Sequence, residues 1–171
     1  MSNYIYNCVQ VTGAGKTFNS FVQKQGSNVN IRDIRIVDDN TVEFESRSDT
    51  PLYEIVLFSK ECKGELILTY NDEGRYIYES QYKIKNGEIL GFRERYNDGE
   101  EAEEYPDWTL ARKYKCVYGL DYGAVVTVIG EPYNISRKGD KAVRVLSNSG
   151  ETGEIEVEEL DYSIYWEEIK R

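Results

Sequence analysis

The chain has 171 residues, of which 31 are acidic, 21 are lysine or arginine and none is histidine, and its formal net charge is −10. Apolar residues make up 40% of it, which is ordinary for a globular protein and excludes disorder as the default state. The absence of histidine excludes Ser–His and Cys–His nucleophilic catalysis, and the excess of acids argues against binding to duplex nucleic acid, which depends on Lys and Arg.

The first 70 residues are predicted to run strand, helix, strand, strand, helix, strand. Some segments alternate apolar and polar residues, and others repeat apolar residues at helical spacing. The second helix begins at Pro51, with Thr50 as its expected cap, and ends at Lys63-Gly64. The expected strands are residues 4–12, 30–37, 41–48 and 65–70, and the first expected helix is residues 16–25.

Two further strands, residues 75–83 and 88–96, are expected to form a hairpin, because Asn86-Gly87 between alternating segments is a strong turn signal. Residues 97–107 then carry six acids and no base, and a block of like charges repels itself. Beyond it, short strands separated by glycine turns are typical of a small barrel of the Src-homology-3 type. These later strands are expected at residues 125–129, 141–146 and 153–157.

Together these patterns predict an α+β fold, in which a ferredoxin-like βαββαβ domain is extended by a β-hairpin and followed by a small C-terminal all-β barrel. The predicted boundaries are residues 1–97 for the first domain, 98–115 for an acidic linker or loop, and 116–171 for the barrel. Residues 1–97 carry 14 acids and 12 bases, whereas residues 98–171 carry 17 acids and 9 bases. The excess negative charge is therefore assigned to the C-terminal part.

Several motifs of the first domain occur in a recognisable order. Near the start stands NCVQVTG, followed by a helix with Phe18 and Phe21, and then by the segments VEFESRSDTP, LYEIVLFSKEC, KGELILTYNDEG and IYESQYKIKNGE. In this order, residues 3–90 resemble the YubB-type ferredoxin-like domain of phages and conjugative plasmids. The resemblance implies a ferredoxin-like fold and a protein carried by a mobile element, and it implies no general activity. Residues 122–160 are similar to small bacterial barrel modules.

The acidic block is a candidate binding surface, because ordered carboxylates with aromatic anchors can occupy a basic groove on another protein. The candidate partner-binding residues are Glu100, Glu101, Glu103, Glu104, Tyr105 and Trp108. A solvated loop that aids solubility is the alternative. The favoured function is a non-enzymatic accessory protein of a phage or mobile element, which binds stoichiometrically to a host or defence protein with a basic surface.

Two alternative functions stay open. A nucleic-acid-associated protein would stack bases on tyrosine rings beside cations, and its candidate residues are Tyr76, Tyr78, Tyr82, Arg93 and Arg95. Packing of these tyrosines against the helices is the competing explanation. A small-nucleotide-binding protein would use residues 13–17, which follow a strand and precede a helix as a phosphate loop does, although Gln10 replaces the first glycine of that motif.

No catalytic residue, cofactor or metal site is expected. Calcium-loop spacing is absent, and with this many acids no carboxylate pair stands out as catalytic. The three cysteines, Cys8, Cys62 and Cys116, are odd in number and widely spaced, which predicts reduced thiols in the cytoplasm. No segment reads as a signal peptide or a membrane span, so no membrane partner is expected.

Overall fold

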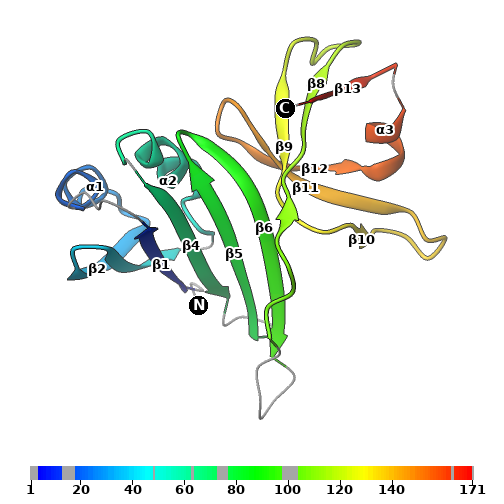
Figure 1. The fold of residues 1–171 in the computed structure, drawn as a ribbon. Helices are drawn as coiled ribbons and strands as arrows, with labels where there is room; N and C mark the ends of the chain where they lie inside the picture. Colours follow the sequence, from blue (N-terminus) through cyan, green and yellow to red (C-terminus); the bar gives the residue numbers. More distant parts are fainter. Residues whose placement is uncertain are drawn as a thin grey trace. The chain divides into compact units, whose positions relative to one another are not determined.

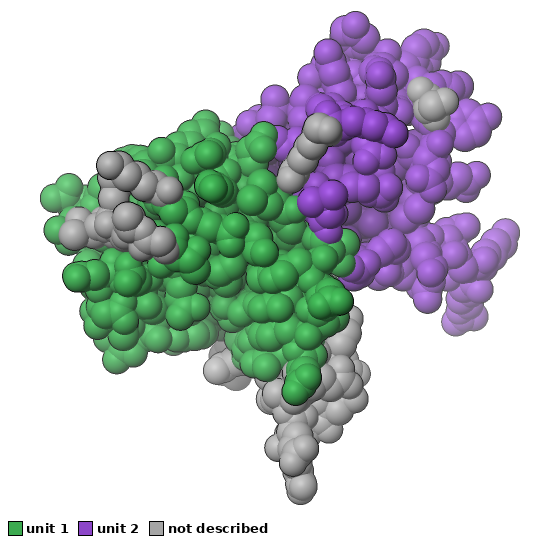
Figure 2. All heavy atoms as spheres, viewed as in Figure 1, with its two compact units in different colours: residues 1–109 green, residues 110–171 purple. Residues whose placement is uncertain are grey.

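The computed structural model describes residues 4–12, 18–47, 49–62, 64–72, 77–97, 104–162 and 164–170. The chain divides into two compact units, Met1–Thr109 (unit 1) and Leu110–Arg171 (unit 2), which Figure 2 draws in green and purple. Unit 1 carries 20 acids and 12 bases, whereas unit 2 carries 11 acids and 9 bases. The excess negative charge therefore belongs to unit 1 and not to the C-terminal part, because residues 98–107 fall within unit 1.

Unit 1 is built on a seven-stranded sheet of order β2-β3-β1-β4-β5-β6-β7 (Figure 1). The pairings from β2 to β6 are antiparallel. On β1, Ile5 and Val9 are buried while Tyr6 is exposed, so the two-residue period gives the sheet one buried face and one open face. The strands are β1 (Tyr4–Thr12), β2 (Ile31–Asp38), β3 (Thr41–Arg47), β4 (Glu65–Asp72), β5 (Ile77–Lys85), β6 (Glu88–Asn97) and β7 (Thr109–Leu110).

Two short helices, α1 (Asn19–Gln25) and α2 (Leu52–Ser59), pack on the buried face. The ring centroid of Phe21 lies 5.2 Å from that of Phe58 on α2 and 5.5 Å from that of Phe44 on β3. The Ser59 hydroxyl accepts a hydrogen bond from the backbone N–H of Gly87 at 2.7 Å, which ties the end of α2 to the β5–β6 turn. The predicted hairpin at this turn is confirmed by the pairing of β5 with β6.

The predicted fold class is wrong. The chain is mostly antiparallel β structure in two sheets, and the three helices in its described part span only 7, 8 and 5 residues. The expected order of elements is present from β1 to β4, but the sheet does not end there. The predicted hairpin pairs with β4 from Leu66↔Ile84 to Asp72↔Tyr78. A ferredoxin-like α+β domain therefore does not describe unit 1, because the hairpin is an integral part of a larger sheet.

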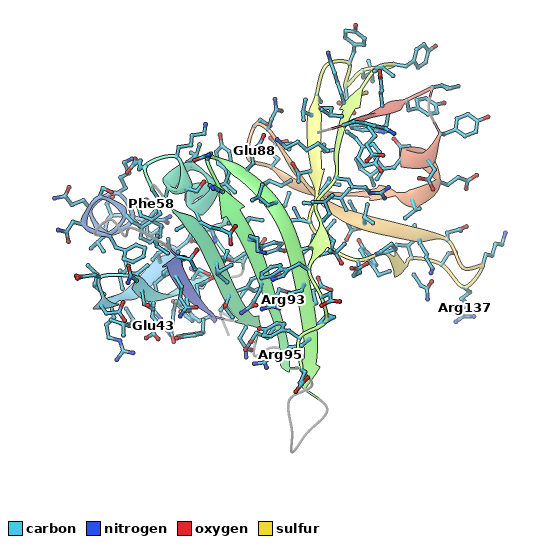
Figure 3. All side chains as sticks on the ribbon, in the orientation of Figure 1. Glu43, Phe58, Glu88, Arg93, Arg95 and Arg137 are labelled. Atoms are coloured by element: carbon cyan, nitrogen blue, oxygen red, sulfur yellow. The ribbon has the colours of Figure 1, made fainter. Side chains whose placement is uncertain are left out.

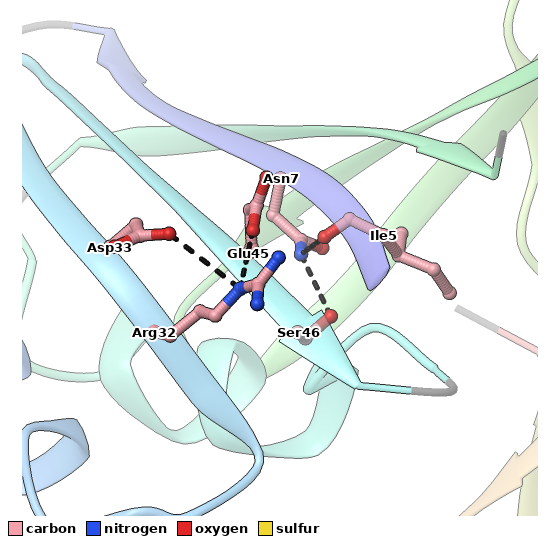
Figure 4. A network of polar contacts seen from close by, with 6 residues as sticks. All are labelled: Ile5, Asn7, Arg32, Asp33, Glu45 and Ser46. Carbon is pink, nitrogen blue, oxygen red and sulfur yellow. Dashed lines mark hydrogen bonds and ion pairs between the residues drawn. The ribbon is translucent and has the colours of Figure 1, made fainter. Parts of the chain in front are cut away.

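A buried polar network explains the one polar residue on the buried face of β1. The side-chain amide of the fully buried Asn7 donates to the backbone C=O of Ile5 at 2.9 Å and to the Ser46 hydroxyl at 2.8 Å (Figure 4). The Thr50 hydroxyl donates to the amide oxygen of Asn7 at 2.6 Å. The predicted capping role of Thr50 is therefore wrong, because its hydroxyl bonds to Asn7 and the N-cap position of α2 is Pro51.

Unit 2 contains a six-stranded sheet of order β10-β11-β9-β8-β13, with β12 paired to β11. The three strands predicted from the sequence, β9, β11 and β12, lie within one residue of the expected bounds, whereas β8, β10, β13 and α3 were not predicted. The indole N–H of the buried Trp166 donates to Glu159 at 3.2 Å, which joins α3 to β13. The elements are β8 (Lys113–Cys116), β9 (Val125–Val128), β10 (Tyr133–Asn134), β11 (Lys141–Ser147), β12 (Thr152–Glu156), α3 (Val157–Asp161) and β13 (Trp166–Ile169).

Candidate functional site

Residues 104–108, which we call the return segment, lie on the open face of the unit 1 sheet beside β5 and β6. Here Tyr105 and Trp108, from the predicted acidic surface, contact two arginines of the predicted nucleic-acid surface. These arginines are Arg93 and Arg95, which Figure 3 labels on β6. The guanidinium carbon of Arg93 lies 4.6 Å from the ring centroid of Tyr105 and 4.2 Å from that of Trp108. Residues that the sequence assigned to two competing sites therefore form one cluster.

The strand register explains how Arg93 reaches the return segment. Arg93 on β6 lies opposite Gln81 on β5, and Gln81 follows the buried Ser80, so both side chains point to the open face. Arg93 donates to the Gln81 side chain at 2.9 Å, and Gln81 donates to the Thr69 hydroxyl on β4 at 3.0 Å. A row of bonded polar side chains thus crosses three strands and ends under the Trp108 ring.

Gly91 leaves room for the Trp108 ring. It lies opposite Lys83 on β5, and a Cβ atom at this position would stand 2.9 Å from the carbonyl oxygen of Thr109 and 3.8 Å from the Trp108 ring. The Lys83 ammonium lies 4.6 Å from the centroid of the same ring. An aromatic ring beside a strand glycine compensates for the missing side chain, so this contact holds the return segment against the sheet.

Tyr105 is held by an ion pair of the sheet. Arg95 lies 2.8 Å from Glu79 and 4.3 Å from the ring centroid of Tyr105, and the Tyr105 hydroxyl donates to Glu79. Burial, together with the hydrogen bond to Glu79, raises the pKa of Tyr105 above its usual range. Both aromatic rings of the return segment are half-buried and contacted by cations of their own unit.

The carboxylates of the predicted acidic surface are only partly described. Glu104 is exposed, whereas Glu100, Glu101 and Glu103 lie outside the described residues. The partner-binding role of this set stays a prediction. The structure adds that Tyr105 and Trp108 already have contacts within unit 1, so they position the segment.

The nucleic-acid alternative requires an exposed face of tyrosines on β5, and the one whose side chain is described, Tyr82, is not exposed. Tyr82 is 1% exposed and stacks on Tyr70, with ring centroids 5.9 Å apart and an interplanar angle of 15°. It faces the core, as the competing explanation predicted, and offers no ring to a base. Tyr76 and the side chain of Tyr78 lie outside the described residues.

The remaining sequence-based candidates concern nucleotides, metals and membranes. Residues 13–17, the candidate phosphate loop, lie outside the described residues. In the part of the chain that the structure describes, no three or more Cys, Asp or Glu side chains are grouped to hold a metal ion. None of the helices described here combines the length and the apolar character needed to cross a membrane.

Unit 2 exposes a set of large apolar side chains that the sequence analysis missed. They lie on two loops, one between β8 and β9 and the other before β13. Their exposed fractions range from 41% for Tyr165 to 106% for Leu120. We call this set the tyrosine cap, and its members are Tyr118, Leu120, Tyr122, Tyr162, Ile164 and Tyr165.

The two loops of the tyrosine cap are neighbours in space. The backbone N–H of Val117 donates to the C=O of Tyr165 at 2.9 Å, which continues the pairing of β8 with β13 drawn in Figure 1. The ring centroid of Tyr165 lies 6.0 Å from that of Tyr118 and 6.4 Å from that of Tyr162. These three rings form one continuous exposed aromatic surface.

The chain around the tyrosine cap is acidic. Residues 116–136 and 145–169, which contain both loops, carry ten acids and no lysine or arginine. Asp121 lies between Leu120 and Tyr122, and Asp161 directly precedes Tyr162, and both aspartates are exposed. The cap therefore combines aromatic rings with carboxylates.

A sequence signal for the tyrosine cap exists. Tyr-Gly-Leu-Asp-Tyr at residues 118–122 and Asp-Tyr-Ser-Ile-Tyr at residues 161–165 each place two tyrosines around a Leu or Ile. Large apolar residues in loops lie mostly at the surface, where binding residues are common. The pairing of β8 with β13 brings the two loops together, and no local sequence pattern predicts this pairing.

Three titratable groups on the open face of β1 and β3, Tyr6, Cys8 and Glu43, have shifted pKa values that favour their usual protonation states at neutral pH. Burial, and then the charge of Glu43, raises the pKa of Cys8 to about 11. Burial and a hydrogen bond to Glu43 raise the pKa of Tyr6 above its usual range, and the hydrogen bonds from Tyr6 and Arg35 lower the pKa of Glu43. A nucleophilic thiol or a general-base carboxylate requires shifts in the opposite direction.

Comparison of the chain with protein-family models, with curated proteins and with solved structures yields no match. The resemblances to the YubB-type domain and to the Src-homology-3 barrel therefore stay predictions.

Proposed function

We propose that this protein acts by stoichiometric binding to another protein through the tyrosine cap, without catalysing a reaction. The observation that carries the proposal is the continuous exposure of Tyr118, Tyr162 and Tyr165. Single exposed apolar residues are normal on a protein surface, whereas a contiguous patch marks an interaction site. Tyrosine is among the residues on which binding energy concentrates, because its ring is large and its hydroxyl tolerates water.

The directions of the pKa shifts of Cys8 and Glu43 make these two groups unsuited to act as a nucleophile and a general base. Cys8 keeps its proton far above neutral pH and Glu43 stays ionised well below it. These groups are therefore held in their resting forms, whereas catalytic acids, bases and nucleophiles have pKa values moved toward the working pH.

The proposed partner is a host or defence protein, which is the kind of target expected for an accessory protein of a phage or mobile element. The three cysteines of the chain, Cys8, Cys62 and Cys116, are odd in number and widely spaced. This pattern is typical of proteins of a reducing compartment, so we propose that the interaction takes place in the cytoplasm.

A second candidate surface is the acidic block of residues 98–107. The observation that favours it is the charge of unit 1, which holds 20 acids against 12 bases. Exposed charges of one sign raise the rate of association with an oppositely charged partner. In this case Tyr105 and Trp108 act by positioning the block on the sheet.

The proposal is tested by capturing partners from a host lysate with the full chain, with and without nuclease, and by measuring the affinity of the captured protein. Tyr118→Ala combined with Tyr165→Ala is expected to lose the partner, whereas Tyr6→Ala, at 40% exposure in unit 1, is the matched control and retains it. Equal affinity of the cap variant and the wild type contradicts the proposal, as does loss of the partner on nuclease treatment.

The same experiment separates the two surfaces. Replacement of Glu100, Glu101, Glu103 and Glu104 by Gln slows association if the acidic block steers the partner, and this effect weakens with added salt. If only the cap variant loses the partner, the acidic block has no role in binding.

A further inference from the structure

Unit 1 contains a recurring arrangement of tyrosine, carboxylate and arginine. The guanidinium carbon of Arg32 lies 3.3 Å from the ring centroid of Tyr4, and its Nε donates to Glu45 at 2.6 Å, a contact drawn in Figure 4. Arg95 repeats the arrangement 4.3 Å from the ring centroid of Tyr105, with a glutamate as its ion partner. In both sites the guanidinium carbon lies over the ring, and a nitrogen of the same group contacts a glutamate carboxylate.

The tyrosine cap holds two of these three components. Its rings are exposed, and the carboxylates of Asp121, Glu158 and Asp161 stand in the same loops or the turn of helix before them, all exposed. Among the described residues, no arginine or lysine lies over Tyr118 or Tyr165, in contrast with the rings of unit 1. The missing component is a cation.

We propose that the tyrosine cap binds arginine side chains of the partner protein. This inference rests on the proposed function and specifies the chemistry of its partner. Guanidinium is favoured over ammonium because it is planar, stacks on aromatic rings and bonds to carboxylates with two parallel N–H groups. Phosphate-bearing partners are disfavoured because the two loops of the cap and the helix turn before them carry Asp121, Glu158, Glu159 and Asp161 and no base.

The test uses two fluorescein-labelled peptides of equal length and charge, octa-arginine and octa-lysine, titrated with the full chain by fluorescence anisotropy. Equal charge makes the long-range attraction the same for both peptides, so the difference in affinity reports stacking and bidentate bonding. Octa-arginine is expected to bind about tenfold more tightly than octa-lysine. The difference is expected to persist at 0.5 M salt, where attraction between exposed charges is screened.

Three variants assign this difference to the cap. Tyr118→Ala combined with Tyr165→Ala is expected to abolish the preference for arginine, whereas the paired Tyr→Phe changes retain it, because the rings remain. Asp121→Asn combined with Asp161→Asn weakens the binding of both peptides. The control Tyr6→Ala, in unit 1, leaves both affinities unchanged.

Two results overturn the inference. One is equal affinity of the wild type for both peptides, and the other is a preference for arginine that survives the double alanine change. These results can be distinguished from failure of the proposed function. If a captured partner requires the cap but the chain shows no preference for arginine peptides, the proposed function stands and only the inference about arginine is wrong.

Discussion

The guanidinium carbon of Arg93 lies 4.2 Å from the ring centroid of Trp108, and this contact joins the sheet of unit 1 to the return segment. The same arginine donates to Gln81 on β5, so the ring, the cation and the strand form one connected unit. The return segment is therefore packed on the sheet of unit 1.

We predict that Trp108→Ala destabilises unit 1 by about 2 kcal/mol, because it removes the cation–π contacts of Lys83 and Arg93 and the half-buried ring. Urea denaturation followed by far-UV circular dichroism measures the change. Trp108→Phe is the matched control and should recover part of the loss. A wild-type unfolding curve for the alanine variant would show that the ring is not held by the sheet.

Gly91→Ala is expected to destabilise the protein by roughly 1–3 kcal/mol, because the added Cβ meets the carbonyl oxygen of Thr109 at 2.9 Å. Gly153→Ala on β12 is the matched control, since a Cβ there meets nothing within 4 Å. The melting temperatures of both variants, measured by thermal unfolding, test this prediction. Equal melting temperatures for the two variants would contradict close packing of β7 against β6.

Asn7→Ala is expected to cost roughly 2–4 kcal/mol, because it leaves the buried hydroxyls of Ser46 and Thr50 without their shared partner. The double change Ser46→Ala and Thr50→Val in the Asn7→Ala background removes the two hydroxyls that have lost their partner. It should therefore reduce the loss of stability. A double-mutant cycle by chemical denaturation measures the coupling. Purely additive effects would show that the three side chains do not act as a network.

Tyr105 gives a prediction for the dependence of stability on pH. Its pKa is raised in the folded protein, so the folded state holds the proton where the unfolded state, with a pKa of about 10, releases it. The free energy of unfolding is therefore expected to fall as the pH rises above about 10. Tyr105→Phe, which cannot ionise, should flatten this slope, as measured by urea denaturation between pH 8 and 11. An unchanged slope would remove Tyr105 as its cause.

Cys8 is expected to react slowly with iodoacetamide, because only the thiolate reacts and its pKa is raised to about 11. At pH 8.5 the rate should be on the order of a hundredfold below that of an ordinary thiol. The urea-unfolded chain serves as the internal reference, and mass spectrometry of peptides distinguishes Cys8 from the buried Cys62 and Cys116. Equal rates in the folded and unfolded states would contradict the shift.

Most of the local structure of the chain can be predicted from its residues alone. Alternating residues such as Ile5 and Val9 identify β1 and its buried face, and Asn86-Gly87 identifies the β5–β6 turn. These features are readable because the period of a strand and the dihedral angles of a tight turn depend on residues that are close in the chain.

The extent of each sheet and the contacts between distant residues could not be predicted in this way and are known from the tertiary structure. Pairing of β5 with β4 turned an expected four-stranded domain into a seven-stranded sheet. Pairing of β8 with β13 placed Tyr118 beside Tyr165 and created the tyrosine cap. Such pairings depend on which strand faces are buried together, and these strands can be far apart in the chain. The two-residue period of a strand is the same whichever strand it pairs with, so the period does not identify the partner.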